Sequence, residues 1–351
     1  MKTNLNDVLK LAFVGCGSIA KAHLAGIEQY APRVRVTALI DPDPKAAARF
    51  VQRTNGTYYA TLDEALKRGD FDAVDIMVPH DLHEELSLLA LQAGKHLLLE
   101  KPMAPTLQAC DRILNCAKES GLVFAVAENA QFWPEIMEVD RLIRTGVIGE
   151  VITAKASFWV QYEPGDLKPR TPWRLDRDRT GGGITIDGGS HWLRPLRIWM
   201  GEITDVIAAV DHPLRSMQGE SLVHALVKFQ SGRIGSFDAL NVDSVLAPAE
   251  WWRVTGTRGE IVVEGGFQSK IVRSQGQKIK IYDEYNPEGN VVMDQGNGYQ
   301  ASFGLEIADF ASAILDGSEL SASAEYSLGE LRTALAMYKS VESGEWERVW
   351  D

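Results

Sequence analysis

The first 130 residues alternate short apolar runs with longer amphipathic stretches, and this alternation constrains the fold more than any other feature. Continuous apolar runs are typical of parallel strands that helices cover on both faces. Helices are expected in the gaps, because Thr61 and Glu64 form a capping box and Gly94 and Gly121 stand where left-handed C-caps belong. The pattern predicts repeated βα units, with strands at residues 11–15, 34–40, 57–60, 73–78, 96–100 and 122–127.

A helical stretch at 134–145 precedes a change to a β-rich pattern. Short turns such as Ser231-Gly232 join the later runs, which is typical of a large, open, mainly antiparallel sheet. With 351 residues the chain exceeds the roughly 250–300 that one core usually holds, so we expect a Rossmann domain at 1–130 and a second α/β domain at 131–351. Strands are predicted at 151–160, 222–229, 234–240, 252–255 and 261–264, and helices that pack back across the domains at 305–315 and 328–341.

Composition limits the kinds of molecule that the chain is expected to bind. The formal net charge of −12 disfavours broad binding to nucleic acid or to an anionic membrane, so a small-molecule ligand is expected. Three cysteines without CxxC spacing predict neither a disulfide framework nor a cysteine zinc site, and His80 with His83 lacks a third ligand in the sequence. We therefore expect no metal site and a cytoplasmic location.

A phosphate-binding motif follows the first predicted strand. The segment from Gly15 through Gly17, Ser18 and Ile19 to Ala20 matches G-x-G-x-x-A between a strand and a helix. In that context the first glycine permits the tight turn, the second lets a pyrophosphate approach the backbone, and the alanine allows close helix packing. The motif predicts a dinucleotide site at the start of the helix.

Asp41 ends the second predicted strand, 24 residues after Gly17. A carboxylate at about this offset, roughly 20 residues, meets the adenosine ribose hydroxyls and repels a 2′-phosphate. NAD is therefore favoured over NADP, although Lys45 lies nearby to offset the charge. The alternative is that Asp41 only begins an Asp-Pro turn.

A lysine at the end of the fifth predicted strand is a candidate catalytic residue. Glu100, Lys101 and Pro102 lie at the carboxyl edge, where ligands bind in open α/β sheets. Lys101 is placed to exchange a proton and, when charged, to stabilise a developing alkoxide. Pro102 is expected to fix the turn, with a cis peptide bond as one way to aim the lysine. The alternative is an ordinary exposed lysine.

A second candidate group follows three consecutive glycines at 181–183. Asp187 and His191 are four residues apart, a spacing that places both on one face of a helix. Gly188 and Gly189 are unfavourable inside a helix, which suggests that a ligand approaches the backbone there. His191 is the natural proton acceptor at neutral pH, with Asp187 orienting it or contacting substrate. As an isolated pair, an Asp and a His on a helix surface are more often structural.

The three motifs together, in this order, resemble the glucose-fructose oxidoreductase, inositol dehydrogenase and MocA (Gfo/Idh/MocA) family over nearly the whole chain. Weaker matches are Pro79 with His83, Phe132-Trp133-Pro134, Ile148-Gly149-Glu150 and Trp173-Arg174. The resemblance implies a Rossmann domain, an open-sheet domain, and a homodimer or homotetramer formed through that sheet. It also implies that Lys101, Asp187 and His191 are the catalytic residues. Pro79, His83, Glu100 and Lys101 are then expected near the cofactor.

Six residues are expected to contact substrate. The family often has an acid where this chain has Arg194, and seven cations against three acids lie within 168–197. These cations suit a carboxylate, phosphate or second sugar, or alternatively form a surface arm that pairs with acids of a neighbouring subunit. The candidate substrate contacts are Asn129, Trp133, Tyr162, Trp173, Arg174 and Arg194.

The resemblance implies hydride transfer between nicotinamide and a secondary ring hydroxyl of a sugar, glycoside or cyclic polyol. Two alternatives share the fold. One is a redox-assisted lyase or glycosidase that retains NAD, and the other is a non-catalytic sugar sensor. The presence of Lys101, Asp187 and His191 argues against a sensor, which needs no proton-transfer residues.

Overall fold

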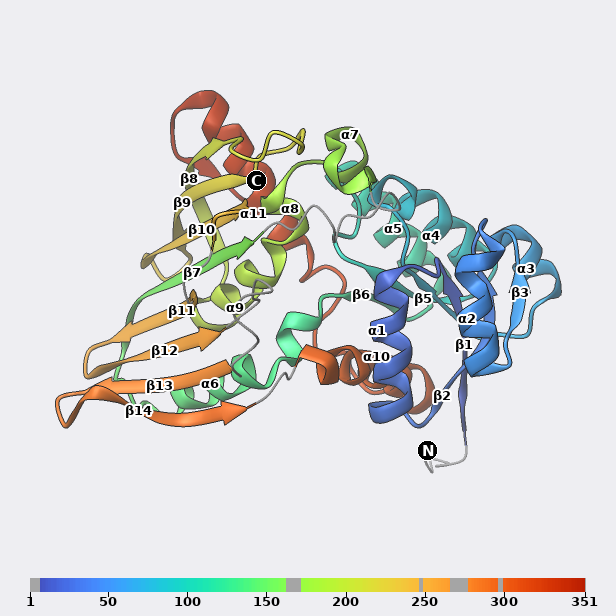
Figure 1. Cartoon of the computed structure of the whole chain (residues 1–351), viewed down its shortest axis with the longest axis horizontal. Coiled ribbons are helices and arrows are strands. Elements are labelled where there is room, and N and C mark those ends of the chain that lie inside the picture. Colours follow the sequence, from blue (N-terminus) through green and yellow to red (C-terminus); the bar gives the residue numbers. More distant parts are fainter. Residues whose placement is uncertain (1–6, 162–171, 246–248, 266–276, 296–298, 351) are drawn as a thin grey trace. The chain divides into compact units, whose positions relative to one another are not determined.

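A computed structural model describes residues 7–161, 172–245, 249–265, 277–295 and 299–350 (Figure 1). These residues form two compact units, which are considered separately. Unit 1 comprises Met1–Phe132 and Tyr299–Leu328, and unit 2 comprises Trp133–Gly298 and Gly329–Asp351. The expected domain boundary after residue 130 stays a prediction. Through the described part of the chain, none of the helices is both long and apolar enough to cross a lipid bilayer.

Unit 1 contains a parallel sheet that is six-stranded within the described residues, in the order β3-β2-β1-β4-β5-β6. This confirms the predicted Rossmann-type arrangement, and every predicted strand is present to within two residues at each end. The strands are β1 (Leu9–Val14), β2 (Val34–Ile40), β3 (Thr57–Tyr59), β4 (Ala73–Ile76), β5 (His96–Glu100) and β6 (Phe124–Ala127).

Helices connect these strands, as the capping signals predict. Thr61 accepts a hydrogen bond from the Glu64 N–H at the start of α3, and Gly121 ends α5 with a left-handed backbone. The connecting helices are α1 (Ser18–Tyr30), α2 (Pro44–Thr54), α3 (Leu62–Arg68), α4 (His83–Gln92) and α5 (Leu107–Ser120), with the 3-10 turns η1 (His80–Leu82) and η2 (Asn129–Phe132).

The helix α10 (Tyr299–Asp316) returns to unit 1 from the far end of the sequence and packs against α1 (Figure 1). Gly26 and Gly304 meet at this crossing. A Cβ atom on Gly26 would lie 2.5 Å from the Gly304 nitrogen, and one on Gly304 would lie 2.4 Å from the Gly26 oxygen. Only glycine at both positions allows the two backbones to approach this closely. Apolar residues of α10, including Ile307 and Phe310, belong to the same core as β1 and α1.

Unit 2 contains the second sheet, nine-stranded within the described residues, in the order β14-β13-β12-β11-β7-β10-β9-β8-β15. Only the β7–β10 pair among these is parallel, so the prediction of a mainly antiparallel sheet is confirmed. The strands are β7 (Val151–Gln161), β8 (Ile203–Asp211), β9 (Leu222–Phe229), β10 (Ile234–Val242), β11 (Ala249–Gly256), β12 (Gly259–Gly265), β13 (Gln277–Asp283), β14 (Asn286–Gln295) and β15 (Glu347–Arg348).

The helices of unit 2 cover one face of this sheet, where α9 packs on β7. Trp192 of α9 joins Trp133, Trp251 and Trp252 in an aromatic core whose ring centroids lie 5.3 to 6.2 Å apart. The helices are α6 (Pro134–Arg144), α7 (Arg177–Thr180), α8 (Ile184–Asp187), α9 (Ser190–Met200) and α11 (Leu328–Ser343), with the 3-10 turn η3 (Pro172–Leu175).

Candidate active site

The loop after β1 has the backbone geometry of a phosphate-binding turn. Gly15 has a φ of +97°, and a Cβ atom there would lie 2.4 Å from the Met77 carbonyl oxygen, so only glycine fits. At Gly17 a Cβ atom would meet no described atom within 4 Å, which leaves space for a ligand beside the backbone. Ala20 is completely buried. No side chain among the described residues caps α1, so its first N–H groups remain available to a pyrophosphate.

Asp41 lies directly beside this loop. Its carboxylate accepts one hydrogen bond from the Cys16 N–H and another from the Asp43 N–H, both at 2.8 Å. The residue therefore does begin a turn, but it also fixes the phosphate loop against the end of β2. Each oxygen keeps a further lone pair, so these bonds are compatible with contacts to ribose hydroxyls.

Arg49 on α2 is a residue of this site that the sequence reasoning missed. Its guanidinium donates to the Cys16 carbonyl oxygen at 2.6 Å and lies 5.0 Å from the centre of the Phe50 ring. The Cys16 thiol is buried, and its pKa is raised to about 12 by burial and by Asp41, with Arg49 opposing. A cation and a carboxylate thus flank one loop. A signal in the sequence was the position of Arg49 one turn into the helix that follows Asp41.

Lys101 follows the last residue of β5, and its peptide bond to Pro102 is cis. Its N–H donates to the Glu100 carboxylate at 3.2 Å. His83 supports the same turn: its Nδ1 lies 2.9 Å from the Pro102 carbonyl oxygen and its Nε2 lies 3.0 Å from that of Val78. Burial lowers the pKa of the His83 imidazole, and the ring lies between the turns after β4 and β5, where its neutral form donates to one of the two carbonyl oxygens. Pro79 stands at the start of η1, between these turns.

Asp187 and His191 do not share one uninterrupted helix. Asp187 ends α8, and His191 is the second residue of α9. The intervening Gly188 and Gly189 keep right-handed helical backbone angles, but a Cβ atom on Gly188 would lie 2.0 Å from the Phe158 ring. One on Gly189 would lie 2.3 Å from the Thr185 oxygen. Packing within unit 2 thus already accounts for these glycines, and the expected approach of a ligand stays a prediction.

Arg174, an expected substrate contact, binds Asp187 in the structure. Its Nη1 donates to both carboxylate oxygens of Asp187, and its guanidinium lies 4.6 Å from the centre of the Trp173 ring. The His191 ring lies 5.9 Å from that of Trp133. Arg174 therefore fixes the carboxylate that sequence reasoning had paired with the imidazole.

The triple-glycine segment is held by two residues that the sequence did not single out. The Glu220 carboxylate accepts hydrogen bonds from the Thr185 N–H at 2.9 Å and from the Tyr338 hydroxyl at 2.8 Å. The Tyr338 oxygen in turn accepts from the Gly183 N–H at 3.1 Å. These bonds set the start of α8, and hence the backbone that carries Asp187.

Several residues that were expected to contact substrate make contacts with other residues of the protein. Asn129 is buried and donates to the Ser302 hydroxyl at 2.8 Å, and Trp133 is 1% exposed within the aromatic core. Tyr162, with Lys168 and Arg170 of the cationic stretch, lies outside the described residues. Substrate contact by Asn129 and Trp133 remains a prediction, and their burial favours a structural role.

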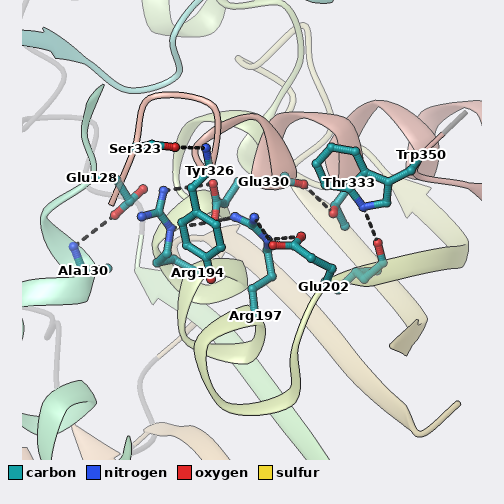
Figure 2. Close-up of polar contacts among 12 residues, drawn as sticks. Glu128, Ala130, Arg194, Arg197, Glu202, Ser323, Tyr326, Glu330, Thr333 and Trp350 are labelled. Atoms are coloured by element: carbon teal, nitrogen blue, oxygen red, sulfur yellow. Dashed lines mark hydrogen bonds and ion pairs between the residues drawn. The ribbon is translucent and has the colours of Figure 1, made fainter. Parts of the chain in front are cut away.

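Arg194 and Arg197 carry two of the charges in the cationic stretch, and both side chains are buried in unit 2 (Figure 2). Arg194 donates from Nε to Glu330 on α11 at 2.7 Å, and Arg197 donates from Nη1 to the same carboxylate. Arg197 also bonds to Glu202 at 2.7 and 2.9 Å. These contacts join α9 to α11, so they favour a structural role for Arg194 over the expected contact with substrate.

The candidate catalytic residues are divided between the units. Lys101 belongs to unit 1 together with the phosphate loop and Asp41, whereas Asp187 and His191 belong to unit 2. Within unit 1, β4 alone separates β1 from β5, so the phosphate loop and Lys101 both follow the carboxyl ends of nearby parallel strands. That edge is the usual ligand site of an open α/β sheet.

Comparison with known proteins matches both halves of the chain to one family. Residues 9–128 match the model described as "Oxidoreductase family, NAD-binding Rossmann fold", and residues 136–262 match the GFO/IDH/MocA C-terminal domain. A 1,5-anhydro-D-fructose reductase from Ensifer adhaerens is 28% identical, over 95% of this chain and 96% of its own.

Two further relatives extend this likeness. A levoglucosan dehydrogenase from Pseudarthrobacter phenanthrenivorans is 25% identical, over 90% of this chain and 91% of its own. The WlbA dehydrogenase from Bordetella pertussis, solved in complex with NADH and UDP-GlcNAcA, superposes with a TM-score of 0.82. It is 20% identical, over 98% of each chain, so this likeness concerns the fold.

Proposed function

The chain belongs to the Gfo/Idh/MocA family of oxidoreductases, and from this premise we propose that it transfers a hydride between a secondary ring hydroxyl of a sugar, glycoside or cyclic polyol and nicotinamide. One observation carries the proposal. A lysine directly follows β5, at the same edge of the sheet as a phosphate loop with open space at Gly17. The names of the two curated relatives, both acting on sugar derivatives, support the substrate class.

Each proposed catalytic residue has a separate task. The phosphate loop and Asp41 would hold NAD, whose nicotinamide would supply the acceptor for the hydride of the carbinol carbon. His191 accepts the hydroxyl proton as that carbon becomes a carbonyl, and Lys101, as an ammonium group, stabilises the negative charge that develops on the oxygen. Asp187, held by Arg174, is a second anchor for the substrate hydroxyl or for His191. In the reducing direction the same proton returns to the oxygen.

The proposed cofactor is NAD in preference to NADP. Asp41 presents its carboxylate beside the phosphate loop, where it suits ribose hydroxyls and opposes a 2′-phosphate. Arg49 contacts the same loop and is the cation that would reduce this opposition. The preference therefore depends on the balance between these two side chains.

The proposed assembly is a homodimer or homotetramer formed through the outer face of the unit 2 sheet. Trp159, Leu226 and Ile234 share this face by strand register, and between 41% and 48% of each side chain is exposed. Exposed apolar groups on neighbouring strands are typical of an interface. Light scattering on the Leu226→Glu variant tests this, because a charge at the centre of an interface dissociates it, and an unchanged mass contradicts the assignment.

The test of function begins with the purified protein. Any bound dinucleotide is released and identified by mass spectrometry, and sugars, inositols and glycosides are then screened with NAD and NADP for absorbance of the reduced nicotinamide. Chromatography of the products detects elimination or hydrolysis without net reduction. We expect oxidation of a ring hydroxyl with NAD. Absence of both bound cofactor and turnover on every substrate would contradict the proposal.

Lys101→Met removes the ammonium group while keeping most of the side-chain volume. We expect turnover to fall by about 100-fold or more, because a charged group aimed at the developing oxyanion is lost. Dinucleotide affinity, measured by quenching of protein fluorescence, should change little. Retained turnover excludes Lys101 from the reaction.

A further inference from the structure

A buried histidine in unit 1 lies at the centre of a network that the proposed reaction does not yet use. His23 is on α1, and its side chain is completely buried. Its Nδ1 lies 2.7 Å from a carboxylate oxygen of Asp75 on β4, and its Nε2 lies 3.1 Å from one of Glu100 at the end of β5. The ring therefore links the phosphate-binding helix to two central strands.

Both ring nitrogens of His23 face carboxylate oxygens, and this geometry favours a charged ring. A neutral imidazole has one N–H, so the other nitrogen would turn its lone pair toward a carboxylate oxygen. An imidazolium donates to both Asp75 and Glu100. Burial by itself lowers the pKa of His23, but the charges and hydrogen bonds of Asp75 and Glu100 outweigh it and raise the pKa well above its usual value.

Two further carboxyl groups surround this network. Glu306 on α10 lies 3.8 Å from the His23 Nε2, and Glu128 follows β6. Burial raises the pKa of Glu306 well above its usual range. The nearby carboxylates raise this pKa further, whereas His23 lowers it. The two Glu306 oxygens have no hydrogen-bond partner among the described residues. The raised pKa favours the protonated form of Glu306, and the Phe303 ring lies 5.4 Å from that of His23.

The network ends at the proposed catalytic lysine. One oxygen of Glu100 faces His23 Nε2, and the other accepts the Lys101 N–H at 3.2 Å. His23 thus holds Glu100, and Glu100 holds the backbone of Lys101. At its other end α1 begins directly after Gly17 of the phosphate loop. The backbone of the lysine and the loop that binds the pyrophosphate are consequently fixed to one side chain.

We propose that His23 is a positioning residue of the reaction: as an imidazolium held between Asp75 and Glu100, it fixes the backbone of Lys101 relative to the phosphate-binding helix. The inference rests on the proposed catalytic role of Lys101. Placement of a reacting group is sensitive to small displacements, since a shift of about 1 Å can lower a rate by as much as about 100-fold. His23 therefore acts on turnover through Glu100 without touching substrate or cofactor.

The test compares His23→Gln and His23→Leu with the wild-type holoenzyme on the substrate found by the screen. We expect His23→Gln, which keeps an N–H donor but no charge, to lower kcat by about tenfold and His23→Leu by more, with KM and dinucleotide Kd changed less than about threefold. The acid limb of the kcat profile should also move to higher pH, because carboxyl groups that lose a cationic neighbour take up a proton at higher pH. His96→Gln is the matched control, since His96 begins the same strand whose last residue is Glu100.

The outcomes separate this inference from the proposed function. If His23→Gln keeps both kcat and the acid limb of the wild type, the positioning role is wrong. It is also wrong if kcat falls only as far as the fraction of protein that binds dinucleotide falls, or if His96→Gln has the same effect. If Lys101→Met retains turnover, the proposed function of the lysine fails whatever the His23 variants do. Loss of turnover in Lys101→Met with normal His23→Gln contradicts the positioning role alone.

Discussion

The carboxylate of Glu330 on α11 binds two arginines of α9, the helix that carries His191. Replacing Glu330 by Gln tests how much these contacts contribute to the free energy of unfolding. The Glu330→Gln substitution keeps the shape of the side chain but removes its charge. Arg194 and Arg197, which are 0% and 1% exposed, then lose the counter-charge that they share. Leaving a buried charge without its partner costs about 3–5 kcal/mol. Because the amide oxygen still accepts one hydrogen bond and Arg197 keeps Glu202, we expect a loss of about 3 kcal/mol, the lower end of that range.

Tryptophan fluorescence during urea unfolding measures this loss selectively. All nine tryptophans of the chain lie in unit 2, so the signal reports the unit that contains the network. Glu202→Gln is the matched control, since Glu202 contacts Arg197 but is 32% exposed and should cost about 1 kcal/mol or less. The argument is refuted if Glu330→Gln unfolds with a free energy within about 1 kcal/mol of wild type, or no lower than that of Glu202→Gln.

Three further predictions follow from other contacts. Asp41→Ala should weaken NAD binding more than NADP binding in fluorescence titrations, because the carboxylate opposes only the 2′-phosphate; an equal loss on both cofactors would reduce Asp41 to a turn residue. Arg174→Met should lower kcat while leaving dinucleotide Kd unchanged, since it removes the bonds that Arg174 makes to Asp187; an unaltered kcat in steady-state assays contradicts the role of Arg174 in holding Asp187. The raised pKa of Glu306 means that its contribution to stability is full below the unfolded value and is lost as pH rises toward the folded one. Glu306→Gln should therefore raise Tm at pH 8 more than at pH 5 in calorimetry, and equal shifts would show that Glu306 is ionised.

The strands of unit 1 could be predicted because most of them read as continuous apolar runs and are buried on both faces. The phosphate loop could also be predicted, because Gly15 and Gly17 lie within a few residues of each other in the turn between β1 and α1. Unit 2 was harder. Strand β13 alternates lysine and isoleucine over only seven residues, and β14 contains Pro287 and Gly289, which disfavour a strand. Both are stabilised mainly by pairing with neighbouring strands, β13 with β12 and β14 with β13.

The parts of the candidate site that could not be predicted depend on contacts between distant segments. His23 reads as one more residue of an amphipathic helix until Asp75, Glu100 and Glu306 are known to surround it. The requirement for Gly188 likewise arises from Phe158, a residue of another element. A one-dimensional pattern gives the type and position of a side chain but not its neighbours, so partners such as these were missed.

The crossing of Gly26 and Gly304 also bears on how the protein is made. During translation α1 is synthesised early, but α10 is synthesised only after nearly all of unit 2. Helix α10 covers α1 and brings Glu306 to His23. Until then the surface of α1 that α10 later covers is exposed on the nascent chain. Such surfaces bind chaperones and promote aggregation. Fragments that stop before residue 299 should for this reason need chaperone assistance to stay in solution, whereas a chain that includes α10 covers this surface itself.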